Sequence, residues 1–130
     1  MIVLDTNVLV RYFADDDPRH ARLADELFES LAEDRPGFVC LTVLIELAWV
    51  LRRTRGMPKT QVLDIIELML RTKELEIEDG ESVDEAVRSA RQGADFSDGL
   101  IAATARLYGS DETVTFDRKA AKTFGWRLLA

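Results

Sequence analysis

Four acidic residues stand within or directly beside apolar segments of the chain. They are Asp5, Glu46, Asp98 and Asp117. Asp5 follows the apolar run 2–4, Asp117 follows TVTF, and Glu46 lies inside LTVLIELAWVL. A glutamate in such surroundings is rarely buried without a partner. Carboxylates that gather at one place repel one another unless protons or cations neutralise them. The pattern therefore indicates a cation site.

The available donor atoms favour a hard divalent cation over zinc. Mg²⁺ takes oxygen ligands and commonly uses one or two carboxylates together with substrate phosphates. Zinc uses histidine and cysteine, but the chain has one of each. His20 lies on a polar helical face and is expected at the surface, whereas Cys40 lies in GFVCL, a pattern typical of a buried strand. Without a histidine base, the chemistry should use metal-activated water, and phosphodiester hydrolysis is the natural reaction.

Most of these acids also have a purely structural interpretation. Aspartate is favoured at helix N-caps, so Asp95 or Asp98 could cap one helix and Asp117 another. Asp5 could cap a helix that follows it. Capping does not explain Glu46. Asp95 is interpreted as an additional acid near the site and not as a primary ligand.

The composition is that of a globular protein. The chain has 130 residues, of which 47% are hydrophobic and 32% charged, and this length suffices for one core. We therefore expect a single domain over residues 1–130. No apolar run approaches the roughly 20 residues that cross a bilayer, and the N-terminus lacks the basic start and unbroken apolar stretch of a signal peptide. A cytoplasmic protein without membrane contact is expected.

Short apolar runs alternate with helical patterns along the chain. Strands are predicted at 2–4, 38–41, 113–116 and 126–129, with a weak edge strand at 75–78. Helices are predicted at 18–35, 42–55, 58–72, 82–92 and 97–108, with a short one after Asp117. Thr42 is the expected cap of the second helix, and SVDE at 82–85 is a capping box for the fourth.

This alternation predicts an α/β fold with three layers, α/β/α, around a central, mainly parallel sheet of four to five strands. In such sheets, ligands bind beyond the carboxyl ends of the strands. Asp5 and Asp117 directly follow strands, while Glu46 and Asp98 lie near the start of helices. All four are therefore expected at one rim of the sheet.

The net charge of −7 is unevenly distributed along the chain. Residues 51–73 contain only two acids, against six basic residues: Arg52, Arg53, Arg55, Lys59, Arg71 and Lys73. Residues 74–85 contain seven acids and no basic residue. Most of these charges should simply be solvated. The basic stretch is nevertheless a possible surface for phosphates.

Four ordered motifs resemble those of the PIN-domain ribonucleases, and more narrowly the VapC-type toxins of toxin–antitoxin pairs. The motifs are MIVLDTNVLV, LTVLIELAWVL, DFSDGLIAATA and VTFDRKA, which together span nearly the whole chain. By motif, the family's acidic metal-binding quartet matches Asp5, Glu46, Asp98 and Asp117. Thr6 and Asn7 match a polar pair that orients the site, and Thr115 matches a hydroxyl residue two positions before the last aspartate. Gly99 stands where an alanine is commoner in the family.

The resemblance implies a PIN-like parallel-sheet fold and an endoribonuclease activity that depends on Mg²⁺ or Mn²⁺. It also implies a homodimer and a small antitoxin protein that occludes the active site. Apolar helical positions such as Ile65, Ile66 and Met69 could pack against a second chain, although they also fit an ordinary core.

Three other interpretations share the fold class. A receiver-type phosphoacceptor domain would need paired acids after the first strand, where the chain has Asp5 alone, and a lysine after the last buried strand. A phosphatase of the haloacid dehalogenase type would need an acid at Asn7 for acid–base chemistry. A catalytically silent protein-binding module would keep the fold, but the intact acids at all four positions argue against it.

Overall fold

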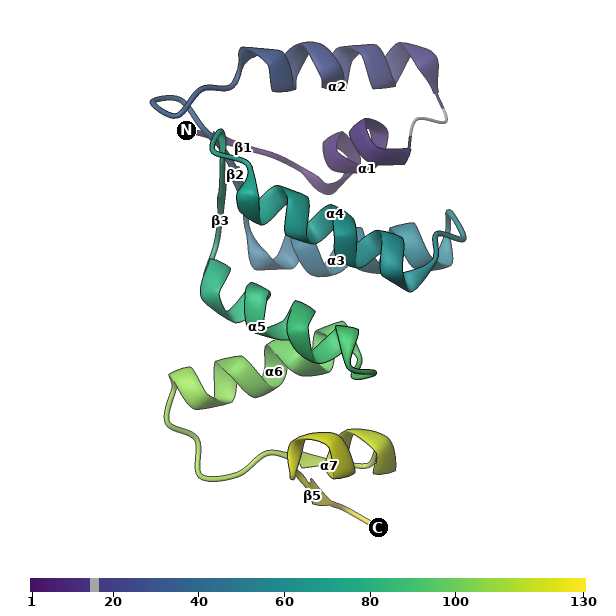
Figure 1. The fold of residues 1–130 in the computed structure, drawn as a ribbon, viewed down its shortest axis with the longest axis vertical. Coiled ribbons are helices and arrows are strands. Elements are labelled where there is room, and N and C mark those ends of the chain that lie inside the picture. Colours follow the sequence, from purple (N-terminus) through teal and green to yellow (C-terminus); the bar gives the residue numbers. More distant parts are fainter. Residues whose placement is uncertain (15–16) are drawn as a thin grey trace. The chain divides into compact units, whose positions relative to one another are not determined.

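The computed structural model describes residues 1–14 and 17–130 (Figure 1). The helices are α1 (Thr6–Ala14), α2 (Pro18–Ser30), α3 (Leu41–Arg53), α4 (Lys59–Arg71), α5 (Gly80–Arg91), α6 (Phe96–Leu107) and α7 (Arg118–Phe124). The strands are β1 (Ile2–Val3), β2 (Gly37–Val39), β3 (Leu75–Ile77), β4 (Val114–Thr115) and β5 (Arg127–Leu128). The chain divides into an N-terminal unit, Met1–Gly80, and a C-terminal unit, Glu81–Ala130.

The N-terminal unit is built on a parallel sheet in the order β1-β2-β3. Its central strand pairs Gly37 with Ile2 on one side and with Leu75 on the other. Helix α1 packs against α2 and α3, and α4 packs against α3 and β3. The side chains that are buried almost completely include Leu4, Leu9, Leu44, Leu47, Leu51, Ile66 and Met69. These apolar faces explain why short strands suffice: most of the buried surface belongs to the helices.

The C-terminal unit contains α5, α6 and α7 and a second parallel sheet, β4-β5. Its buried side chains are mostly small, among them Val83, Ala86, Val87, Ala90, Ala102 and Ala103. A Cβ atom at Gly99 of α6 would lie 3.0 Å from the Cα and 3.1 Å from the Cβ of Ala86 in α5. Small residues therefore allow these two helices to approach closely.

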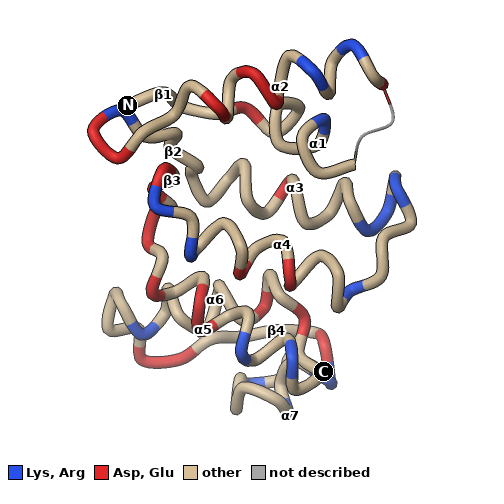
Figure 2. Tube along the Cα trace, turned by 45° about the horizontal axis from the view of Figure 1, so that its top comes forward, with Lys and Arg blue, Asp and Glu red and all other residues tan. Residues whose placement is uncertain are grey.

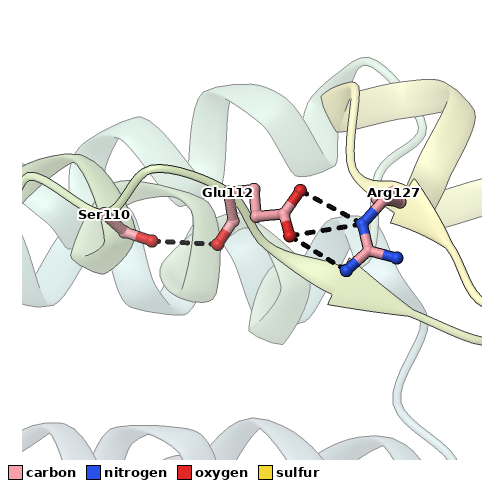
Figure 3. A network of polar contacts seen from close by, with 3 residues as sticks. All are labelled: Ser110, Glu112 and Arg127. Atoms are coloured by element: carbon pink, nitrogen blue, oxygen red, sulfur yellow. Dashed lines mark hydrogen bonds and ion pairs between the residues drawn. The ribbon is translucent and has the colours of Figure 1, made fainter.

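Strand β5 is held by both backbone and side-chain contacts. The Arg127 N–H donates to the Thr113 carbonyl at 2.9 Å, and the Leu129 N–H donates to the Thr115 carbonyl at 2.8 Å. The Arg127 guanidinium also donates to both carboxylate oxygens of Glu112, at 2.9 to 3.2 Å (Figure 3). The Glu112 carbonyl in turn accepts a hydrogen bond from the Ser110 hydroxyl at 2.9 Å.

The predicted α/β class with parallel strands is confirmed, and all five predicted strands are present. The largest sheet has three strands instead of four to five, because β4 and β5 pair with each other and form a sheet of their own. None of the helices within residues 1–14 and 17–130 has both the length and the apolar character that crossing a bilayer would require.

Three local predictions were wrong. Helix α3 begins at Leu41, so Thr42 lies inside the helix and does not cap it. The residue at the cap position is Cys40, whose side chain makes no capping hydrogen bond. The Leu41 N–H donates instead to Oε1 of Glu78 at 2.8 Å. Helix α5 begins at Gly80, which places Ser82 in its first turn, where it is buried. Cys40 follows β2 and is only partly buried.

Two other differences concern helix bounds. Helix α2 ends at Ser30 and not at residue 35, because Ala32 and Arg35 pair through two backbone hydrogen bonds, of 3.0 and 3.2 Å, and close a tight turn. Helix α1 follows Asp5 immediately, in a segment for which a helix was considered only as an alternative. His20 lies at the surface, as predicted, with its Nδ1 atom 2.9 Å from Oδ2 of Asp17.

The contact between Gly99 and Ala86 gives a testable prediction. Alanine should improve the intrinsic helix propensity of α6 by up to about 1 kcal/mol, but its methyl group would meet backbone atoms of α5, and overpacking typically costs about 1–3 kcal/mol. We expect Gly99→Ala to lower the free energy of unfolding in a urea titration. Gly80→Ala is the matched control, because its Cβ would lie at an ordinary 3.6 Å from a Leu70 methyl group. A Gly99→Ala protein as stable as the wild type would contradict the tight contact.

Candidate functional site

The N-terminal unit contributes Asp5 and Glu46, which are connected through Thr6. The Leu4 N–H donates to the Phe38 carbonyl of β2 at 2.9 Å, which fixes the chain just before Asp5. Burial then alternates: Leu4 and Thr6 are buried and Asp5 between them is exposed. The apolar neighbours therefore build the core while the carboxylate stays outside it, beyond the carboxyl end of β1.

Thr6 links helix α1 to helix α3. Its side chain is buried, and its hydroxyl donates a hydrogen bond to Oε1 of Glu46. Glu46 itself is exposed, so its apolar sequence context does not place it in the core. A hydrogen bond from a buried hydroxyl restricts the rotamers of this otherwise solvated carboxylate. Asn7, the other member of the polar pair, is exposed on α1.

The C-terminal unit contributes Asp95, Asp98 and Asp117. Asp95 is the N-cap of α6, and its Oδ2 atom accepts from the Asp98 N–H at 3.1 Å. Asp117 is the N-cap of α7 and accepts from the Ala120 N–H at 3.1 Å. The hydroxyl of Thr115 accepts from the Asp117 N–H at 3.0 Å. The capping predictions for Asp95 and Asp117 are thus confirmed, and Thr115 is placed to orient Asp117.

Among these three acids of the C-terminal unit, Asp98 is the one whose side chain is not at a helix cap. It is half-buried in the first turn of α6, one turn after the cap residue. Burial, and then the negative charges of Asp95 and Asp117, raise the pKa of its carboxyl group. The carboxylates of Asp95 and Asp117 therefore both lie within electrostatic reach of Asp98, and a cation would relieve the energetic cost.

The donor chemistry fits Mg²⁺ or Mn²⁺, because the predicted ligands offer only carboxylate oxygens. Within the described residues, no group of three or more His, Cys, Asp and Glu side chains is arranged to hold a metal ion. Asp5 and Glu46 belong to the N-terminal unit, and Asp98 and Asp117 belong to the C-terminal unit. Their joint role as a metal-binding quartet stays a prediction.

Glu78 is a supporting residue that the sequence analysis missed. It follows β3, and its carboxylate accepts the N–H of the first residue of α3, the helix that carries Glu46. A carboxylate is favourable at a helix N-terminus for electrostatic reasons. The sequence did contain a signal that could have identified Glu78, because this acid stands at the end of a predicted strand. The same signal identified Asp5.

The raised pKa of Asp98 predicts a stability effect that does not depend on any activity. Because the folded protein disfavours the charged carboxylate, the destabilisation is fully present well above the raised pKa and disappears as pH falls below the ordinary value of 3.8. Asp98→Asn should therefore raise the melting temperature at pH 7, by about 1–3 °C, in buffer containing chelator.

The control for that measurement is Asp111→Asn, since Asp111 is exposed and lies in the loop before β4. It removes one negative charge from the same acidic chain without affecting α6. An Asp98→Asn protein that melts below the wild type at pH 7 would show that the carboxylate stabilises the fold, contrary to this account.

The comparison with known families covers nearly the whole chain. The model of the PIN domain matches residues 2–124, a span that contains all the predicted site residues. No match was found among curated protein sequences. PIN domains are generally metal-dependent nucleases and typically use divalent metals. The chain therefore belongs to the PIN domain family and has a nuclease-type fold.

Proposed function

We propose that the protein is an endoribonuclease that hydrolyses RNA phosphodiester bonds and uses Mg²⁺ or Mn²⁺ held by Asp5, Glu46, Asp98 and Asp117. The observation that carries the proposal is the Asp98 carboxylate, which is half-buried near Asp95 and Asp117 and has a raised pKa. Such an arrangement costs stability, and carboxylates kept at that cost are characteristic of functional sites. The family match over residues 2–124 supports the same interpretation.

In this reaction Thr6, Asp95 and Thr115 position the carboxylates that would hold the metal. A bound divalent cation would supply Lewis-acid activation of the attacking water and of the phosphoryl group. Thr6 holds one carboxylate oxygen of Glu46 in place through its hydrogen bond. Asp95 fixes the first turn of α6 and hence the position of Asp98. Thr115 does the same for Asp117 through the Asp117 backbone N–H.

The biological setting that we propose is that of a VapC-type toxin in the cytoplasm. The support is the ordered set of four motifs, which together span nearly the whole chain. In this setting residues 1–130 form one PIN domain, as the family match across both units supports. The chain would act as a homodimer, and a small antitoxin protein would inhibit it.

RNA as substrate agrees with the basic residues of α3 and α4, although these form two groups. Arg52, Arg53, Arg55 and Lys59 lie at the corner between the two helices, while Arg71 and Lys73 lie at the other end of α4 (Figure 2). Eleven residues of α4 lie between Lys59 of the first group and Arg71 of the second, so only one of the two groups can be next to a given nucleotide. The corner group follows Glu46 along α3 and is the better candidate for binding phosphates near the site.

Cleavage of a pool of structured cellular RNAs tests the proposal directly. The wild-type protein should cleave with Mn²⁺ and not with chelator. Asp5→Asn and Asp98→Asn should each reduce the rate by more than about a hundredfold, because even the partners of metal ligands typically contribute about 10–100-fold. Asp111→Asn is the matched control and should cleave like the wild type. Full cleavage by folded Asp98→Asn protein would overturn the assignment, and absence of cleavage by any folded protein would favour a silent protein-binding module.

Metal binding gives a second test that needs no substrate. Mg²⁺ or Mn²⁺ at about 100 times the dissociation constant should stabilise the folded protein by about 2.7 kcal/mol and raise its melting temperature. Asp98→Asn should lose most of this stabilisation, whereas Asp111→Asn should keep it. A wild-type melting temperature that neither cation changes, even at saturating concentrations, would count against the metal site.

A further inference from the structure

The exposed face of α3 carries an acid, an aromatic residue and basic residues in sequence. The side of the helix that forms the core consists of Leu44, Leu47 and Leu51, each with no exposed surface. On the opposite side, Ile45 is 40% exposed and Trp49 is 59% exposed. Glu46, Arg52 and Arg53 are also exposed.

Helical spacing aligns these exposed residues along one line. Trp49 follows Glu46 by three positions, and Arg53 follows Trp49 by four, so neighbours in this series lie one above the other on the helix surface. From Glu46 to Arg53 the helix rises by about 10 Å, which is about three nucleotide steps in a stacked strand. The order along the line is carboxylate, indole and guanidinium.

The turn that follows the basic end of this line is held by the neighbouring residue Arg52. The Arg52 guanidinium donates to the Met57 carbonyl at 3.3 Å, and Gly56, with a φ of 65°, allows the chain to turn there. No side-chain hydrogen bond or ion pair of Arg53 is found among the residues that the structure describes. A guanidinium in this position can bind a phosphate by two parallel hydrogen bonds.

We propose that this face of α3 binds an unpaired RNA strand, with a base stacked on Trp49 and a phosphate held by Arg53, and leads the strand to Glu46. This inference rests on the proposed ribonuclease function and specifies the form of its substrate. Exposed aromatic side chains stack on bases only where the bases are unpaired, and arginines beside them neutralise the backbone. The charge of the corner group complements RNA, although the whole chain is acidic.

Binding experiments in chelator, and again with Ca²⁺, test the inference separately from cleavage. The Trp126→Phe background leaves Trp49 as the only tryptophan, since the chain has two. A short oligo(A) RNA should quench the fluorescence of Trp49, and a fully paired, blunt-ended RNA duplex should not. Anisotropy of labelled oligo(A) then gives the affinities of variants in the full-length protein.

Trp49→Ala should weaken oligo(A) binding about tenfold and leave its salt dependence unchanged, since stacking involves no counterions. Trp49→Phe should retain most of the affinity. Arg53→Ala should reduce the slope of log affinity against log salt concentration by about 0.7, the value for one phosphate contact with a single strand. Leu23→Ala is the matched control, because Leu23 is an apolar residue of α2 with 55% exposure.

Three results would overturn the inference: unchanged affinity in folded Trp49→Ala protein, equal binding of the RNA duplex and the single strand, or no quenching by bound RNA. If light scattering shows a dimer that Trp49→Ala dissociates while RNA affinity is unchanged, the face is a protein interface and the inference is wrong. Metal-dependent cleavage by the wild type that Trp49→Ala leaves intact would retain the ribonuclease function and reject only this surface. Oligo(A) binding through Trp49 without any cleavage would support the RNA-binding surface and count against the ribonuclease function.

Discussion

The hydrogen bond from the Thr6 hydroxyl to Glu46 connects the two helices on which the N-terminal unit depends. Thr6 begins α1 directly after the candidate ligand Asp5, and Glu46 lies in the middle of α3. Helix α3 packs on α1 and α4 and thus forms the centre of this unit. This polar contact fixes one carboxylate of the candidate site and leaves the apolar side of α3 entirely to the core.

Much of the fold was predictable because local patterns and long-range packing agree. Every predicted strand and every predicted helix is present, and Asp95 and Asp117 cap helices as their sequence positions indicate. The errors arise where a distant residue competes with a local one. Glu78, which is 37 residues away from Leu41, caps α3 in place of the nearby Thr42. No local pattern reveals that contact, because the pairing of β2 with β3 creates it.

The candidate site shows the same division between local and long-range information. Residue types and motif order identified the candidate acids. Their positions, directly after strands or near the start of helices, were also expected from the sequence. The sequence did not show that Glu46 is exposed, or that the basic stretch 51–73 separates into two groups. Both results follow from helix geometry. An apolar helix still has one side outside the core, and basic residues of one short stretch of sequence can lie at opposite ends of a helix.

The last strand has a consequence for local unfolding. Strand β5 is two residues long, and its side-chain anchor, the pair of Glu112 and Arg127, is exposed to solvent. Exposed ion pairs are screened by salt, and short strands with few buried contacts open at a small free-energy cost. Its partner β4 leads through Thr115 to Asp117. Opening of β5 would therefore free the segment that orients the Asp117 carboxylate. Ionic strength would then influence the position of that carboxylate without any ion binding to it.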